Sequence, residues 1–352
     1  MKVLLVTFSD NADHQDTLFG MYEMIRSKVD ATLLAIKTPK VSVSIDENVW
    51  LVDCPKRPGI TRKTFDLPLL MSIVQRIRKE QFDYIYFESL HMWNLPIMIF
   101  GGKAKIYHVI HEVIPHEGDS QEQMVDLMNK AVCKFTDYIV LRNQTYVQTL
   151  ADRYGFPVNH IIYSELWRRF PKYTAPMHTK NMLFFGRMNP YKGIDNLLAI
   201  AKACPDVHFS VIGKADSQIE SIVNELSSLK NVTVKTGYVS DDAMHEAFVQ
   251  ADWIILPYNS ASQSGVIIDA YKYSRPVVAF NVGAIQEQIR DGISGYLIPA
   301  GDNAAFVEKI KEVMSMPEAE YDKMTYYAYE YGRKKYATCG AAERFLALFG
   351  TT

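Results

Sequence analysis

Short apolar runs that alternate with helical patterns constrain the fold of this chain most. The first run, KVLLVTF, is continuously apolar and ends at Ser9, which is typical of a strand buried on both faces of a parallel sheet. Similar runs recur, and segments with helical periodicity separate them, so the pattern predicts parallel sheets covered by helices. The expected strands are 31–35, 49–52, 84–87, 106–110, 138–141, 182–185, 208–212, 232–235, 253–256, 277–280 and 296–298, and the expected helices include 67–79, 196–203, 218–229, 242–249 and 338–349.

The length of the chain, 352 residues, favours two domains over one. A segment with two prolines and no clear period, SELWRRFPKYTAPMHTK, is the expected linker. We therefore predict two doubly wound α/β domains at 1–165 and 166–334, followed by a helical segment at 335–352 that packs back on the first domain.

Composition excludes several classes of protein. The net charge of −2 argues against a general nucleic-acid binder. The four cysteines are far apart and form no CxxC pair, which favours free thiols over a zinc site or a disulfide framework. The chain shows neither a signal peptide nor an apolar stretch of the ~18 residues that a membrane span needs. We therefore expect a cytoplasmic protein.

One segment leaves a membrane contact open. Residues 56–105 contain nine Lys or Arg and four acidic residues. Within it, Lys56, Arg57, Arg62 and Lys63 precede an apolar stretch at 67–71. Such a patch suits anionic headgroups at the inner face of a membrane, or the diphosphate of an acceptor. An ordinary solvated basic surface is the alternative.

The informative residues of the second half follow expected strands. Gly186 and Arg187 come directly after 182–185, and Lys192 follows within the same loop. Open α/β sheets bind ligands at the carboxyl ends of their strands. Two cations at this edge suit a diphosphate, although they also fit a solvated loop.

A second loop of this kind precedes an expected helix that begins near Gly265. Small residues at a helix start leave N–H groups that face an anion. Asp269, one turn into that helix, suits a ribose. The alternative is structural, with Ser264 as N-cap and Asp269 as an acid that complements the helix dipole.

Taken together, FFGRMNPYKGIDNLL, FSVIGKAD, NVTVKTGYVSDDAMHEAFVQADWIILP and SGVIIDAYKYSRPVVAFNVGAIQEQIRDGISGYLI resemble the C-terminal domain of the family-4 retaining glycosyltransferases, over about residues 182–314. The resemblance implies a GT-B fold with two Rossmann-like domains facing a central cleft. It also implies a nucleotide-diphosphate-sugar donor, no catalytic metal and no cofactor. In the resemblance, Arg187 and Lys192 match the residues that bind the donor diphosphate. The other positions that it assigns to the donor are Gly186, Tyr238, Val239, Ser264, Gly265, Val266 and, at the ribose, Asp269.

The sequence departs from the family in two places. The family usually has an acid eight residues before the one matching Asp269, but Ala261 stands there, and we expect Ser262, Gln263 or Ser264 to contact the sugar instead. The glycine-rich loop after the first strand is also missing. The groups in its place are Asp10, Asp13, His14 and Asp16, which suit either an acceptor site or a solvated loop.

His111 is the strongest candidate in the first half, because it follows the strand expected at 106–110. With Glu112 it resembles the His–acid pair of the family, which implies contact with the acceptor or donor sugar near the reacting carbon. His116 is a further acceptor-site candidate. A hydrogen-bonded loop histidine is the structural alternative.

These observations predict a retaining, metal-independent hexosyltransferase of polysaccharide biosynthesis. Its catalytic residues would be His111, Arg187 and Lys192, and its acceptor a glycan, a lipid-linked molecule or a small molecule. The alternatives are a non-catalytic GT-B-like partner that binds a nucleotide sugar, and a nucleotide-sugar epimerase.

Overall fold

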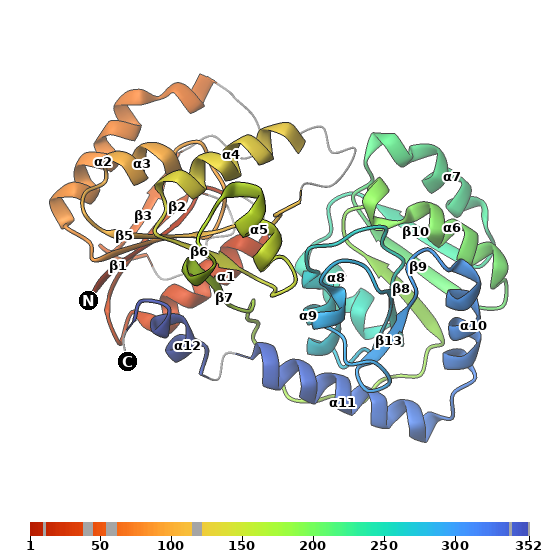
Figure 1. Ribbon diagram of the computed structural model, residues 1–352. Helices are drawn as coiled ribbons and strands as arrows, with labels where there is room; N and C mark the ends of the chain where they lie inside the picture. The colour runs from red at the N-terminus through yellow and green to blue at the C-terminus, as the bar shows by residue number, and fades with distance from the viewer. Residues whose placement is uncertain (10–11, 38–44, 54–61, 115–121, 338–339, 351–352) are drawn as a thin grey trace. The chain divides into compact units, whose positions relative to one another are not determined.

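A computed structural model describes residues 1–9, 12–37, 45–53, 62–114, 122–337 and 340–350. The chain forms two compact units. The first comprises the described residues up to Trp167 together with those after Ala337, and the second runs from Arg168 to Ala337 (Figure 1).

The first unit is built on a seven-stranded parallel sheet in the order β3-β2-β1-β4-β5-β6-β7. The strands are β1 (Lys2–Thr7), β2 (Asp30–Ile36), β3 (Val49–Val52), β4 (Tyr84–Phe87), β5 (Lys105–Val109), β6 (Tyr138–Leu141) and β7 (Ile161–Tyr163). The helices are α1 (Ala12–Ile25), α2 (Leu67–Glu80), α3 (Asn94–Phe100), α4 (Glu122–Phe135), α5 (Val147–Tyr154) and α12 (Ala341–Ala347).

Both faces of this sheet are covered, which explains the continuous apolar runs. In β1, Leu4 and Val6 pack into the core beneath α2–α5, whereas Val3 and Leu5 pack into the core shared with α1 and α12. Figure 1 shows α2, α3 and α4 along one face of the sheet and α12 beside α1. Because both faces of such a strand are buried, its sequence does not alternate between apolar and polar residues.

The second unit has a six-stranded parallel sheet in the order β10-β9-β8-β11-β12-β13. Its strands are β8 (Asn181–Phe185), β9 (His208–Gly213), β10 (Val232–Thr236), β11 (Trp253–Leu256), β12 (Val277–Phe280) and β13 (Gly295–Ile298). Its helices are α6 (Ile194–Ala203), α7 (Glu220–Ser228), α8 (Asp241–Val249), α9 (Gly265–Lys272), α10 (Asn303–Met314) and α11 (Glu318–Tyr336).

The end of the chain differs from the sequence prediction. The helix expected at 338–349 is shorter, because α12 begins at Ala341 after Gly340, whose φ of 71° is left-handed. Thr338, where the sequence pattern places the start and possible N-cap of this helix, lies outside the described residues. The preceding helix, α11, was not predicted. The chain then rejoins the first unit, where the Phe345 ring packs edge-on against Tyr86 and Glu343 pairs with Lys28.

Two of the four cysteines are described, and both Cys133 and Cys204 are free thiols. Burial raises the pKa of the Cys133 thiol to about 12, so this thiol stays protonated near neutral pH. Cys54 and Cys339 lie outside the described residues. In the described part of the chain, no helix has both the length and the apolar character required to cross a bilayer.

Candidate functional site

The strand order places two of the predicted loops together in the second unit. The chain runs outward from β8 through β9 to β10, then returns to β11 on the other side of β8. This reversal is the topological switch point, where open α/β sheets bind ligands at the carboxyl ends of the strands. The loop of Gly186–Lys192 follows β8, and the loop that leads into α9 follows β11.

Glycines bring the backbone close at this edge. Gly186 has a φ of 114°, and its N–H donates to the Ile212 carbonyl at 3.0 Å. Gly193, the N-cap of α6, has a φ of 63°, and a Cβ there would lie 1.8 Å from the Pro257 carbonyl oxygen, just after β11. Only glycine fits such a contact, so the loops after β8 and β11 are held directly against each other.

Lys192 extends across this edge toward α9. A Cβ on Gly186 would lie 3.3 Å from Lys192 Nζ and 3.7 Å from Cγ2 of Val266. An ammonium group and the first turn of a helix therefore both lie next to the Gly186 backbone. Lys192 Nζ also donates to the Tyr258 hydroxyl at 3.2 Å and lies 4.9 Å from the centre of that ring. Burial raises the pKa of Tyr258, so this phenol is neutral.

The two predicted cations differ in environment. The Arg187 side chain is exposed, as expected for a solvated cation, whereas Lys192 is half-buried and hydrogen-bonded. The alternative of a solvated loop therefore fits Arg187 but not Lys192. Its ammonium group is oriented by Tyr258 before any ligand arrives.

The start of α9 supplies backbone donors. The first N–H groups of a helix have no partner within the helix, and their dipoles favour an anion. Ser264, the N-cap residue, is an exception to the prediction, because its N–H donates to Gln288 Oε1 at 2.7 Å while Gln288 Nε2 donates to its carbonyl at 3.0 Å. The predicted anion-binding amides are thereby reduced to those of Gly265 and Val266.

Asp269 is the fifth residue of α9 and only 9% exposed. Its Oδ1 lies 3.4 Å from Nε of Arg168, the first residue of the second unit. This ion pair was not predicted from the sequence. Asp269 is therefore a nearly buried carboxylate with a built-in counter-charge.

The remaining residues that were predicted to bind the nucleotide-sugar donor lie on the loops around this edge. Ala261, at the place of the missing acid, is 3% exposed and its carbonyl accepts from the Ala284 N–H at 3.2 Å. Ser262 and Gln263 are half-buried. Tyr238, after the carboxyl end of β10, is 78% exposed, and Val239 is half-buried.

The first unit has its own switch point, between β1 and β4. The carboxyl end of β1 is joined to the loop after β4 by a 3.1 Å hydrogen bond between the hydroxyls of Thr7 and Ser89. Beyond β1, the Ser9 hydroxyl bonds to Nδ1 of His14 at 3.0 Å. His14 therefore lies at the ligand-binding edge of this sheet.

His111 meets this edge from the loop after β5. Its ring stacks on His14 with 4.4 Å between centroids. Its Nε2 lies 2.7 Å from the Glu88 carbonyl oxygen and 3.6 Å from Glu88 Oε1. A carbonyl only accepts, so Nε2 carries the proton and the tautomer of His111 is fixed.

Glu88 was missed by the sequence analysis. It follows β4, is 1% exposed, and its carboxylate receives two bonds from Arg142 Nη2, at 2.8 and 2.6 Å, and one from the Tyr86 hydroxyl at 3.1 Å. Arg142 follows β6. The available signal was an acid and an arginine, each directly after a buried strand, at the same edge of the sheet as His111.

The other predicted residues of the first unit contribute less to this cluster. Glu112 is half-buried, and its carbonyl accepts from Asn129 Nδ2 at 2.9 Å. Asp16 is exposed on α1. Asp10 and His116 lie outside the described residues, as does the side chain of Asp13. Among the residues that the structure does describe, no three His, Cys, Asp or Glu side chains are grouped so as to hold a metal ion.

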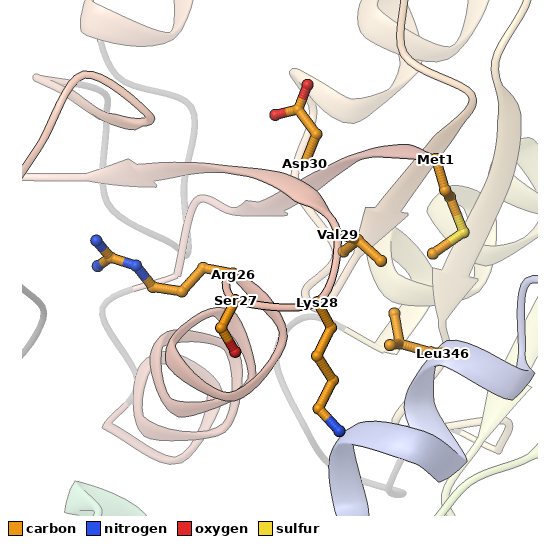
Figure 2. Close-up of a pocket in the computed structure, with 7 residues that line it drawn as sticks. All are labelled: Met1, Arg26, Ser27, Lys28, Val29, Asp30 and Leu346. Atoms are coloured by element: carbon orange, nitrogen blue, oxygen red, sulfur yellow. The ribbon is translucent and has the colours of Figure 1, made fainter.

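A hollow of about 540 Å³ lies at the opposite edge of this sheet, beside the amino ends of β1 and β2. Figure 2 shows Lys28 pointing from its rim toward α12. Its cations are already paired, Lys28 with Glu343 and Arg26 with Glu23 and Asp46. We assign no site there.

Sequence comparison matches residues 179–316 to the family described as glycosyl transferases group 1. An uncharacterized 41.2 kDa protein from the cps region of Klebsiella pneumoniae is 26% identical over 269 residues, 70% of this chain and 72% of that protein. The phosphatidyl-myo-inositol mannosyltransferase of Mycobacterium leprae is 30% identical over 141 residues, 38% of this chain and 37% of that protein. The chain thus spans little more than a third of the length of this named relative.

Structural comparison covers both units. Anabaena HepE, solved with UDP and glucose, superposes with a TM-score of 0.80 over 100% of each chain at 14% identity. The same protein has also been solved with UDP-glucose, again with a TM-score of 0.80. Sucrose-phosphate synthase from Thermosynechococcus elongatus gives a TM-score of 0.73 over 99% of this chain. These similarities show the fold of the chain.

Proposed function

We propose that this chain is a retaining glycosyltransferase that uses a nucleotide-diphosphate sugar. Its residues 179–316 match the family described as glycosyl transferases group 1, and its two units have the GT-B fold. The observation that carries the proposal is the close approach of Lys192 Nζ and the first turn of α9 to Gly186. A positive side chain and a helix N-terminus at a switch point form an anion site. Arg187, exposed in the same loop, is the second cation.

In the proposed reaction, the bond between the sugar C1 and the diphosphate oxygen breaks, and the electron pair leaves with the diphosphate. Lys192, Arg187 and the amides of Gly265 and Val266 stabilise the charge that develops there, which is the usual source of the largest catalytic contribution. The acceptor hydroxyl attacks C1 from the face that the diphosphate left, and its proton passes to the departing diphosphate oxygen. The anomeric configuration is thereby retained.

We propose UDP as the nucleotide. HepE, which shares this fold, binds UDP and UDP-glucose. Asp269 would accept hydrogen bonds from the ribose, Tyr238 and Val239 would border the base, and Ser262 and Gln263 would contact the sugar. The sugar is proposed to be a hexose.

The acceptor is assigned to the cluster around His111 in the first unit. Glu88 and Arg142 hold His111, and His14 stacks on its ring. An acceptor hydroxyl from a glycan, a lipid-linked molecule or a small molecule would bind there. The similarity to a Klebsiella protein of the cps region supports a role in polysaccharide biosynthesis.

The proposed reaction needs no metal ion, because two cations and a helix N-terminus are available to the diphosphate. Turnover should accordingly be the same with and without a chelator. A loss of activity in chelator that added Mg²⁺ restores would contradict this part of the proposal.

A peripheral membrane contact is proposed for the helices of the first unit. Large apolar side chains are exposed on three helices that pack side by side, and they include Leu67 of α2 (59%), Phe100 of α3 (56%) and Leu127 of α4 (63%). Exposed apolar groups of this extent mark interaction surfaces. Lys134 of α4, also exposed, adds positive charge. Of the basic residues noted in the sequence, Lys56 and Arg57 lie outside the described residues, as do the side chains of Arg62 and Lys63.

We predict that the protein sediments with anionic vesicles at low salt and less so as salt rises, since each basic residue near the surface contributes ~1 kcal/mol. The variant Leu127→Glu should weaken binding, whereas Tyr327→Glu, at a 53% exposed position on α11, should not. An equal loss of vesicle binding in both variants, or no sedimentation of the wild-type protein, would contradict the proposed membrane contact.

One observation favours a second function. The buried Ala261 leaves the protein without the acid that the family usually directs at the sugar. A non-catalytic partner that binds a nucleotide sugar fits this feature, and a nucleotide-sugar epimerase is a further rival. Release of UDP from a donor would exclude a non-catalytic partner. Conversion of the donor sugar without release of UDP would instead indicate an epimerase.

A thermal-shift screen of nucleotide sugars tests the donor proposal. A ligand at about 100 times its dissociation constant stabilises the protein by ~2.7 kcal/mol. For a unit of this size that corresponds to several degrees. No shift with any uridine, guanosine, adenosine or thymidine diphosphate sugar would overturn the proposal.

A further inference from the structure

Arg168 lies where the chain passes from the first unit to the second. The preceding residue, Trp167, is buried in the core of the first unit, and its indole N–H donates to the Thr17 carbonyl at 3.0 Å. The backbone of Arg168 is fixed within the second unit, because its N–H donates to the Tyr336 carbonyl at 2.8 Å and it pairs with Ala337, the last residue of that unit. This anchorage uses main-chain atoms, so it persists when the side chain is changed.

The side chain of Arg168 is directed to α9. It is 9% exposed, and Nε lies 3.4 Å from Oδ1 of Asp269. An arginine from the linker thus pairs with a carboxylate on the helix whose first turn borders the anion site. In a nearly buried ion pair, removal of one charge is destabilising because the other charge is left uncompensated.

The helix that carries Asp269 is itself fixed to α11. A Cβ on Gly332 would lie 2.3 Å from Cβ of Tyr271, so α11 and α9 are in close backbone contact. The Tyr271 hydroxyl donates to the Gln288 carbonyl at 3.0 Å, and Gln288 in turn holds both backbone groups of Ser264. These contacts fix the backbone of α9, but they do not fix the side-chain torsion angles that orient the Asp269 carboxylate. The ion pair with Arg168 restrains these angles.

We propose that Arg168 is a positioning residue for nucleotide recognition: it orients the Asp269 carboxylate toward the hydroxyls of the ribose. The inference rests on the proposed function, in which Asp269 binds the ribose. A carboxylate offers about four acceptor positions, so an ion pair with Arg168 and hydrogen bonds from two ribose hydroxyls are compatible. An oriented carboxylate also binds hydroxyls more tightly than one that must first be ordered.

The test compares UDP with 2′,3′-dideoxy-UDP, which keeps the base and the diphosphate but lacks both ribose hydroxyls. Dissociation constants are measured by calorimetry for the full chain and for Arg168→Gln. Because hydrogen bonds to a charged group are the strong ones, the wild-type chain should prefer UDP by about 10-fold or more. In Arg168→Gln, as in Asp269→Asn, this preference should fall to about 3-fold or less. Arg168→Lys, which keeps the charge without the guanidinium geometry, should be intermediate.

A matched control is Arg333→Gln on α11, where an exposed arginine pairs with Glu330. It should leave the preference at the wild-type value. A purely structural role for Arg168 would weaken both ligands equally and keep the ratio unchanged, and that result overturns the proposal. If Arg168→Gln does not fold, an unchanged ratio in Arg168→Lys overturns it instead.

Different results would contradict the proposed function and the role of Arg168. A wild-type chain that binds neither nucleotide contradicts the proposed function. A wild-type chain that binds UDP and its dideoxy analogue equally leaves the phosphate site standing but overturns the role of Arg168.

Discussion

Replacement of Lys192 by alanine removes the cation on which the proposed donor site depends. A unit charge about 4 Å from a phosphate oxygen, at an effective dielectric constant of about 20, contributes ~4 kcal/mol. Loss of a single electrostatic donor in enzymes typically costs ~3 kcal/mol. We therefore expect Lys192→Ala to lower turnover by about 10²-fold or more.

The structure adds a stability effect to this prediction. Lys192 Nζ donates to the buried Tyr258 hydroxyl, and a buried polar group that loses its partner costs ~1–3 kcal/mol. The melting temperature should fall by a few degrees, at ~2–4 °C per kcal/mol for a unit of this size. Arg187→Ala should lower turnover with little change in melting temperature, because its side chain is exposed.

Tyr258→Phe is the matched control. It removes the same hydrogen bond but leaves the ammonium group and the ring beneath it in place. The assay measures UDP release from the donor that the thermal-shift screen identifies, together with the melting temperature of each variant. We expect Tyr258→Phe to lose stability but less than about 10-fold in turnover. Equal losses of turnover in Lys192→Ala and Tyr258→Phe, or normal turnover in Lys192→Ala, would refute the reasoning.

Three further predictions concern single contacts. Asp269→Ala should weaken the binding of UDP and of the full donor alike, whereas Gln263→Ala should leave UDP binding intact and change turnover or donor choice. Calorimetry with both ligands measures this difference. If both variants weaken UDP binding equally, Gln263 contacts the nucleotide instead. Gly186→Ala should weaken UDP binding, since the added Cβ would lie 3.3 Å from Lys192 Nζ. Gly102→Ala, at a φ of 121° with open space around it, should cost stability but not binding. Glu88→Gln should lower turnover and leave UDP affinity unchanged, because Glu88 holds His111 in the other unit; a loss of UDP affinity would contradict that division.

The parallel sheets were predictable from the sequence because burial on both faces leaves a direct signal. Runs such as KVLLVTF have no polar alternation, and the strand β1 that they form is enclosed by helices on both sides. Gly186 and Lys192 were also predictable, since a glycine and a cation after a buried strand fall at the ligand-binding edge.

The buried ion pairs were not predictable in the same way. Glu88 and Arg142 form a pair because β4, β5 and β6 are neighbours in the sheet, and the sequence does not show that order. Arg168 lies in a stretch that has the composition of a linker, and its pairing with Asp269 depends on a contact between distant segments. The helix expected at 338–349 begins only at Ala341, because its N-cap Gly340 has a left-handed φ that the residue pattern does not reveal.

The measurement that tests the central claim most directly is proton NMR of the protein incubated with the UDP-sugar that gives the largest thermal shift. We predict slow cleavage of the donor, with UDP as one product and a released sugar that first has the anomeric configuration of the donor. Lys192→Ala should reduce the rate by about 10²-fold. Absence of cleavage above the rate in buffer would contradict the assignment of a glycosyltransferase, and first release of the opposite anomer would contradict retention.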